Sequence, residues 1–160
     1  MNNERNRQME VNRSTIESMI RDILMEKLGS GTADFSRNKL KEGIISVKVP
    51  SIRVSQNDLM DTGKPGDVVY TKDLFSLEES PRLGCGIMEM KETTFDWTLN
   101  YDEIDYVIEG TLNIVINGKT ATANAGELVL IPKGSSIKFS VPNYARFIYV
   151  TYPADWANQG

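Results

Sequence analysis

From Asp67 onward, apolar residues fall in short runs separated by turn residues at intervals of about eight to twelve positions. The runs are rich in β-branched residues, and none repeats its apolar positions at helical spacing. Asn117-Gly118 lies between two runs and favours a two-residue hairpin, because both residues tolerate a positive φ. The predicted strands are Val68–Tyr70, Cys85–Lys91, Ile104–Glu109, Leu112–Ile116, Lys119–Ala123, Leu128–Ile131, Ser136–Val141 and Ala145–Tyr152. The pattern predicts an all-β barrel or jelly roll over residues 67–160.

A different pattern, typical of an amphipathic helix, occupies residues 14–28. Ser14 and Glu17 have the spacing of a capping box, and Gly29-Ser30-Gly31 supplies the stop. One apolar stripe is formed by Ile16, Met19, Ile20, Ile23, Leu24 and Leu28. Two interpretations stay open: the stripe packs on the barrel or on a second copy of the chain, or it docks into a groove of a partner protein. The polar residues 1–13 before it are expected to be disordered, so residues 1–30 form a first segment.

Residues 31–66 form a weakly structured lead-in to the barrel. Ile44–Val49 and Ile52–Val54 have the composition of short strands, and Pro50 separates them.

The composition excludes several kinds of catalytic chemistry, but it says less about the class of protein. The chain contains no histidine, which removes imidazole bases, Ser-His and Cys-His nucleophile pairs and the commonest transition-metal ligand. A net charge of −4 argues against nucleic acid or an anionic membrane as a partner. The single cysteine, Cys85, excludes an intramolecular disulfide and suits a reducing cytoplasm. No apolar run approaches the roughly 20 residues of a spanning helix, so we expect a soluble protein that stays inside the cell.

Two segments resemble the paired motifs of the cupin family. In the stretch from Trp97 to Gly110, Glu103 and Gly110 have the Glu-to-Gly spacing of the first motif. Gly126, the turn Pro132-Lys133-Gly134 and then Ile137 follow the order of the second motif. The resemblance implies a cupin-type barrel.

The departures from the cupin pattern concern the metal ligands. Trp97 and Leu99 stand where the first two histidines would be, and Ile137 stands at the third, so only Glu103 remains. A transition metal needs three or four converging ligands, and we therefore predict no iron, manganese, nickel or zinc at this position.

The same strand can still form a ligand site. If Glu103 points inward, Asp105 and Val107 should do so too, with Tyr101 near the mouth, because alternate residues of a strand share a face. Two carboxyl groups in an apolar space need a cation, a basic side chain or a shared proton. A structural ion pair or a carboxyl at the solvent edge is the alternative to a ligand site for a small molecule.

A closer resemblance, over residues 67–157, is to the EutQ-like ethanolamine-utilisation branch of the cupins. It is carried by residues 95–106, by residues 131–137 and by the segment from Arg146 to Ala154. The resemblance implies a role in bacterial ethanolamine catabolism inside a protein-shelled microcompartment, and acetate kinase activity between ATP and acetate. It also implies that the helix at 14–28 docks to shell or cargo proteins. Cupins commonly pair, so we expect a homodimer.

The resemblance and the residues together leave two main functions open, and the kinase function is the one that the resemblance implies. As a kinase, the protein would use Glu103, Asp105 and Tyr101 as catalytic residues, with Mg²⁺ held by the two carboxyls. The residues expected to bind the substrates ATP and acetate are Trp97, Lys133, Ser135 and Arg146, with the turn at Lys133 as an anion cradle. The alternative is a non-catalytic binding or assembly module of the microcompartment, and a small-molecule sensor is a third, weaker possibility.

Overall fold

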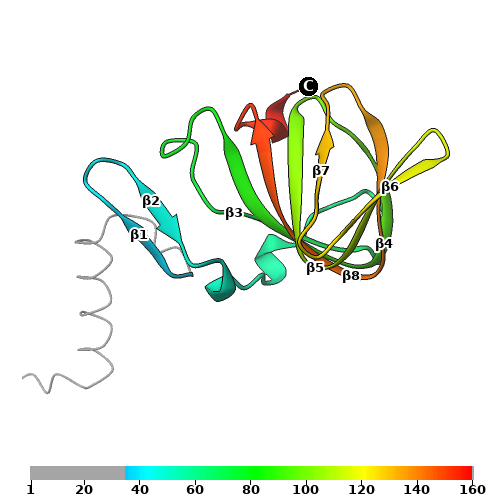
Figure 1. Ribbon diagram of the computed structural model, residues 1–160, viewed down its shortest axis with the longest axis horizontal. Coiled ribbons are helices and arrows are strands. Elements are labelled where there is room, and N and C mark those ends of the chain that lie inside the picture. Colours follow the sequence, from blue (N-terminus) through cyan, green and yellow to red (C-terminus); the bar gives the residue numbers. More distant parts are fainter. Residues whose placement is uncertain (1–34, 160) are drawn as a thin grey trace, which may run out of the picture.

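The computed structural model describes residues 35–159, and nearly all of the regular structure in them is β-strand (Figure 1). Six strands form one antiparallel sheet in the order β3-β4-β8-β5-β6, and β7 pairs with the free part of β5. Their bounds are β3 Val68–Asp73, β4 Gly84–Thr98, β5 Asp102–Ile116, β6 Lys119–Asn124, β7 Leu128–Ile131 and β8 Ser136–Tyr152. The sheet curls around a common interior, as predicted for an all-β barrel.

Three strands are much longer than predicted. β5 runs through both predicted strands Ile104–Glu109 and Leu112–Ile116, β8 unites Ser136–Val141 with Ala145–Tyr152, and β4 continues to Thr98. The apparent breaks are register shifts within continuous strands. Gly110, for example, has φ +78°, and a Cβ there would lie 1.9 Å from the Tyr144 carbonyl oxygen. Glycine therefore marks a bulge at this point and not a turn.

The lead-in was predicted only in part. β2 (Ile45–Val47) lies within the predicted strand at Ile44–Val49, and it pairs with β1 (Arg37–Lys39), which the sequence did not indicate. The prediction of a strand at Ile52–Val54 is wrong. Two single-turn 3₁₀ helices, η1 (Val49–Ser51) and η2 (Gln56–Asp58), flank this segment, and the Ile52 side chain is fully buried.

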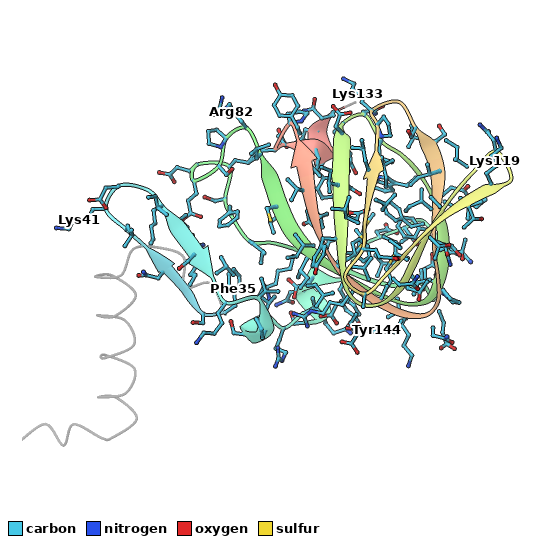
Figure 2. The ribbon with its side chains drawn as sticks, viewed as in Figure 1. Phe35, Lys41, Arg82, Lys119, Lys133 and Tyr144 are labelled. Atoms are coloured by element: carbon cyan, nitrogen blue, oxygen red, sulfur yellow. The ribbon has the colours of Figure 1, made fainter. Side chains whose placement is uncertain are left out.

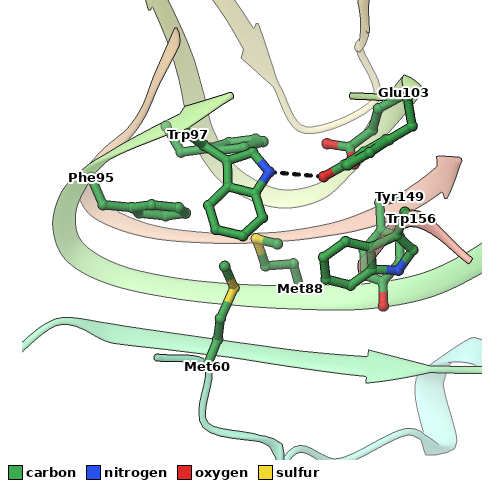
Figure 3. Close-up of a pocket in the computed structure, with 9 residues that line it drawn as sticks. Met60, Met88, Phe95, Trp97, Glu103, Tyr149 and Trp156 are labelled. Atoms are coloured by element: carbon green, nitrogen blue, oxygen red, sulfur yellow. Dashed lines mark hydrogen bonds between the residues drawn. The ribbon is translucent and has the colours of Figure 1, made fainter. Parts of the chain in front are cut away.

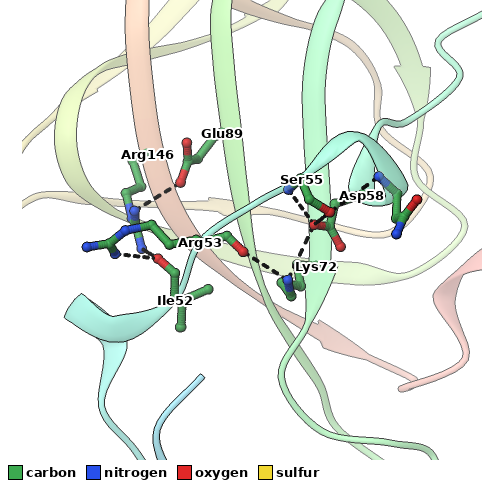
Figure 4. A network of polar contacts seen from close by, with 8 residues as sticks. Ile52, Arg53, Ser55, Asp58, Lys72, Glu89 and Arg146 are labelled. Carbon is green, nitrogen blue, oxygen red and sulfur yellow. Dashed lines mark hydrogen bonds and ion pairs between the residues drawn. The ribbon is translucent and has the colours of Figure 1, made fainter. Parts of the chain in front are cut away.

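Two cations fasten the lead-in to the barrel (Figure 4). Arg146 on β8 donates to the Glu89 carboxylate (2.9 Å) and to the Ile52 carbonyl oxygen (3.1 Å). Lys72 on β3 donates to the Arg53 carbonyl oxygen at 2.8 Å. Beneath these contacts lies a small apolar cluster formed by Ile52, Leu74 and Ile87. The main core fills the barrel interior.

The helix predicted at residues 14–28 and the polar start before it lie outside the described residues. Within residues 35–159, no helix has the length and apolar character needed to cross a membrane.

Candidate functional site

The inward side of β5 carries two carboxyl groups. Glu103, Asp105 and Val107 are buried, and the residues between them are exposed, which confirms the predicted alternation. Glu103 is 4% exposed and Asp105 is fully buried. On β8, their partners across the sheet are Thr151 and Tyr149 respectively.

Strand β4 pairs with β8 on its other side, and it carries Gly86 opposite Tyr149. A Cβ at Gly86 would lie 2.0 Å from the Tyr149 ring, so only glycine lets the ring lie over the strand. The Tyr149 hydroxyl then donates to the Asp73 carboxylate on β3, at 2.7 Å. The row Asp73, Gly86, Tyr149 and Asp105 thus crosses four paired strands.

Glu103 lines a small cavity inside the barrel, which we call the cup (Figure 3). The cup is lined by Met60, Met88, Phe95, Trp97, Tyr101, Glu103, Phe139, Tyr149 and Trp156. The space open to the centre of a water molecule is about 10 Å³, which is enough for a single water. Six of the nine lining residues are aromatic, and Glu103 supplies the charge.

Trp156 closes the cup from the C-terminal 3₁₀ helix η3 (Trp156–Asn158). Its ring centroid lies 6.4, 5.8 and 6.3 Å from those of Trp97, Tyr101 and Tyr149. The Trp97 indole N–H donates to the Tyr101 hydroxyl oxygen at 2.8 Å. These contacts hold the rings together across the entrance.

An open groove, which we call the mouth groove, lies directly outside this entrance. It shares Met60, Trp97, Tyr101 and Trp156 with the cup and has a volume of about 380 Å³. Its remaining lining residues are Asp61, Thr98, Asn100, Ala157 and Gln159. The cup and the groove are therefore separated only by side chains.

The two carboxyl groups lack the partners that buried charges normally have. Across residues 35–159, the buried side-chain atoms without a hydrogen-bond partner are Glu103 Oε1, both Asp105 carboxyl oxygens and Thr151 Oγ1. Burial raises the pKa of Glu103 to about 7. Burial also raises the pKa of Asp105 well above its usual range, and the nearby charge of Glu103 raises it further. Asp105 therefore keeps its proton, and Glu103 ionises first.

Tyr101 and Tyr149 remain neutral hydroxyl groups in this setting. Burial raises the pKa of both above the ordinary range, with the Glu103 charge contributing for Tyr101 and the Asp73 charge for Tyr149. Neither phenol can act as a base near neutral pH.

The other predicted binding residues lie apart from the cup. The turn at residues 132–135 has no free cradle of N–H groups: Lys133 N donates to Asp102 Oδ1, Gly134 N to the Leu99 carbonyl and Ser135 N to the Pro132 carbonyl. The Ser135 hydroxyl also donates to the Pro132 carbonyl, at 2.7 Å. The prediction of an anion cradle at this turn is therefore wrong. Lys133 itself is exposed at the end of the barrel near the C-terminus (Figure 2).

Arg146 also lies elsewhere, contrary to its predicted role in substrate binding. It alternates with the buried Ala145 and Phe147, so its side chain points to the outer side of the sheet, where it meets Glu89 and the lead-in. The charge of Glu103 is not neutralised by Arg146.

Five residues that line the cup were missed in the sequence: Met60, Met88, Phe95, Tyr149 and Trp156. Met60 comes from the lead-in and Trp156 from the C-terminal tail, and both line the cup. Trp156 offered a signal, because tryptophan side chains are highly buried on average.

At the three positions that carry histidine in metal-dependent cupins, this chain has other residues, and their side chains lie in the barrel interior. Leu99 and Ile137 are buried in the core, and Trp97 packs against it. Within the described part of the chain, no group of three Cys, Asp or Glu side chains is placed to hold a metal ion.

Fold and site together define a cupin-type barrel with an aromatic, acidic interior. The cupin domain of Cnp3 from Schizosaccharomyces pombe has a similar fold, with a TM-score of 0.52 at 15% identity over 71% of this chain and 77% of that one. The sequence model of the ethanolamine utilisation protein EutQ matches residues 11–158. The chain belongs to the EutQ family.

Relatives in this family are similar over most of the chain. Acetate kinase EutQ of Clostridioides difficile (strain 630) is 66% identical over 151 residues, which cover 93% of this chain and 96% of the relative. The solved structure of the Clostridium difficile EutQ protein has a TM-score of 0.80 at 72% identity, over 81% of this chain and 94% of that one. Acetate kinase EutQ of Salmonella typhimurium is 35% identical over 89% of this chain, which spans 62% of its length.

Proposed function

We propose that this ethanolamine utilisation protein has acetate kinase activity, converting ATP and acetate to ADP and acetyl phosphate at the mouth of its barrel. Its strongest support is the 66% identity to a relative of that name over nearly the whole of both chains. The geometry adds a buried carboxyl pair directly beneath a groove large enough for small-molecule substrates.

The chain's own residues can bind acetate through hydrogen-bond donors. A neutral Glu103 carboxyl donates a hydrogen bond to a carboxylate, and its pKa of about 7 leaves about half of it neutral at neutral pH. The Tyr101 hydroxyl, neutral at any physiological pH, is a second donor. Acetate is larger than the water-sized cavity, so Trp156 and Met60 must move toward the mouth groove to admit it.

ATP and Mg²⁺ do not fit the cup as it stands. Among the described residues that line the cup or the mouth groove there is no Lys or Arg to meet phosphate. Mg²⁺ requires six oxygen ligands and usually keeps several waters, and the cup has space for one. The nucleotide of the proposed reaction therefore binds outside the cup.

The test is a coupled assay for ADP release that depends on both ATP and acetate, in protein purified from a host lacking its own acetate kinase. We expect Glu103→Gln to lower kcat/KM for acetate at least tenfold, since an amide cannot reproduce the carboxyl's proton and charge states. Glu109→Gln is the matched control, because Glu109 lies on the same strand but is exposed. Equal activity of wild type and Glu103→Gln would mean that the cup takes no part in the reaction.

An exposed apolar surface supports a second candidate function, a non-catalytic assembly module of the ethanolamine microcompartment. We call this surface the outer apolar face. It consists of Ile104, Tyr106, Leu128, Leu130, Val150 and Tyr152, which are 36–64% exposed. Ile104 pairs with Leu130 on one side and with Val150 on the other, so the side chains form one patch on β7, β5 and β8.

The occupant we propose for the outer apolar face is a second copy of the chain. Light scattering should then give a dimer for wild type, and a monomer for Leu130→Glu. Leu77→Glu is the control, since Leu77 is 51% exposed but lies outside the face. A Leu130→Glu protein that stays dimeric would exclude this surface, and a monomeric wild type would exclude the homodimer. Loss of shell association on removal of residues 1–29 would support the docking role predicted for that segment.

A further inference from the structure

The Glu103 carboxyl group in the cup includes a hydrogen-bond acceptor that has no donor. Glu103 lines the cavity and is almost fully buried, and its Oε1 lacks a hydrogen-bond partner within residues 35–159. Two polar hydrogens of the lining residues are directed elsewhere: the Trp97 N–H to Tyr101, and the Tyr149 O–H to Asp73. A buried acceptor without a donor costs about 1–3 kcal/mol, and more when it is charged. A ligand that brings N–H groups to this point would remove the cost.

The charge of the pair selects a monovalent partner. Asp105 keeps its proton while Glu103 ionises, so the two carboxyl groups together carry one negative charge. A single positive charge neutralises it, whereas a divalent ion leaves an excess charge in an apolar interior.

The size and the walls of the cup point to the same class of ligand. The cavity holds one water-sized group, and a primary ammonium group has about this size. The cavity walls include Trp97, Tyr101, Tyr149 and Trp156, and the faces of such rings attract a cation within about 6 Å. Aromatic rings bind organic ammonium ions in other proteins, and here the Glu103 carboxylate adds a hydrogen-bond acceptor.

We propose that the cup binds a primary ammonium group, which donates N–H hydrogen bonds to Glu103 and lies against the aromatic rings of the entrance. A short tail on the ligand passes between Met60 and Trp156 into the mouth groove, where Thr98 and Asn100 can bind a hydroxyl group. The ligand is either a small primary amine, of which ethanolamine is an example, or the free ammonium ion. This ligand occupies the same cup as the acetate of the kinase proposal, but it binds the opposite charge state of Glu103.

Proton linkage separates an ammonium ligand from acetate. An ammonium group binds the ionised Glu103, so its affinity rises with pH up to about the pKa of that group and then levels off. Acetate binds the neutral form and shows the reverse. The titratable groups that face Glu103 are Asp105 on its own strand, Tyr101 and Tyr149, with Asp73 reached through the Tyr149 hydroxyl. The first three stay protonated over this range, so Glu103 is the group that titrates.

The experiment uses the intrinsic fluorescence of Trp97 and Trp156, the two tryptophans of the chain, together with calorimetry. Ethanolamine hydrochloride is titrated into the full-length protein between about pH 5.5 and pH 8.5. Ethylene glycol serves as a neutral analogue of the same shape, and ammonium chloride and sodium acetate are titrated in parallel. We expect saturable binding of ethanolamine and at least tenfold weaker binding of ethylene glycol. The ethanolamine affinity should rise about tenfold per pH unit below pH 7.

The variants separate Glu103 from general effects on the fold. Glu103→Gln should weaken ethanolamine binding at least tenfold and abolish its pH dependence, whereas Glu109→Gln should bind as wild type does. If Glu103→Gln fails to fold, the pH dependence of the wild type decides alone. Ammonium binding as tight as ethanolamine binding identifies the free ion as sufficient, and much weaker ammonium binding identifies an amine.

Three results would overturn the proposal: no binding of either cation, equal binding of ethylene glycol, or an ethanolamine affinity that falls as pH rises. A failed kinase assay leaves these measurements unaffected, so the two proposals can fail separately.

Discussion

Replacing Glu103 by glutamine should change how folding stability depends on pH. The pKa of Glu103 rises from an ordinary value of 4.5 to about 7 because the side chain is buried. An acid with a raised pKa stabilises the folded state in its neutral form. This contribution is fully present below pH 4.5, declines as the pH rises from 4.5 to about 7, and is absent above that.

The size of the effect follows from the same two pKa values. Each pKa unit corresponds to about 1.4 kcal/mol, so the move from 4.5 to about 7 corresponds to about 3 kcal/mol. Glutamine does not ionise and should remove this dependence. Between about pH 5 and pH 8, the free energy of unfolding of the wild type should fall by roughly 2–3 kcal/mol relative to Glu103→Gln. With an m-value of about 2 kcal/mol/M, the urea midpoints should shift by more than 1 M relative to one another.

Urea unfolding followed by tryptophan fluorescence at several pH values measures this difference directly. Glu109→Gln is the control, and its stability should follow that of the wild type at every pH because the side chain is exposed. A constant difference between wild type and Glu103→Gln from about pH 5 to pH 8 would mean that Glu103 titrates normally. The buried, unpartnered carboxyl on which both ligand proposals depend would then not exist.

Three further substitutions test other parts of the structure. Gly86→Ala should lower the free energy of unfolding by about 2–4 kcal/mol, because the new Cβ overlaps the Tyr149 ring; combining it with Tyr149→Leu should recover part of the loss in urea unfolding. Arg146→Leu should cost about 1–3 kcal/mol in the same assay by leaving Glu89 half-buried and unpaired, yet leave ligand affinity unchanged. Trp156→Ala should admit water to the cup and lower the pKa of Glu103 toward 4.5, seen as a flatter dependence of stability on pH.

Local patterns and the cupin motif together were sufficient for the interior of β5. Alternation over residues 102–107 put Asp105 and Val107 on the same face as Glu103, and the cupin motif supplied the expectation that this face is the interior. The same rule applied to residues 145–147 would have placed Arg146 outward. The loss of the histidine cluster followed from comparing the sequence, which contains no histidine, with the cupin motif.

The length of the strands was harder to predict. Gly110 and the pair Pro142-Asn143 have the composition of turns, yet they lie within β5 and β8. Glu92, opposite the second of these, has φ +45°, so the two paired strands bend at the same place. Such bends depend on the partner strand, which a single sequence does not specify.

The walls of the cup could not be predicted for a similar reason. Met60 and Trp156 meet Glu103 only because the lead-in and the C-terminal tail fold back over the same end of the barrel. The N–H groups of the turn at Lys133 are taken up by Asp102 and Leu99, which are distant in sequence. Contacts of this kind follow from the tertiary structure and not from local composition.

The position of Met60 has a practical consequence for anyone preparing shortened versions of the protein. A fragment that begins at residue 67, where the strand pattern starts, would lack Met60 from the wall of the cup. It would also lack Ile52, which packs against Ile87. Ligand measurements on such a fragment would describe a different, more open site. Expression clones intended for screening should therefore retain the segment from Phe35 onward.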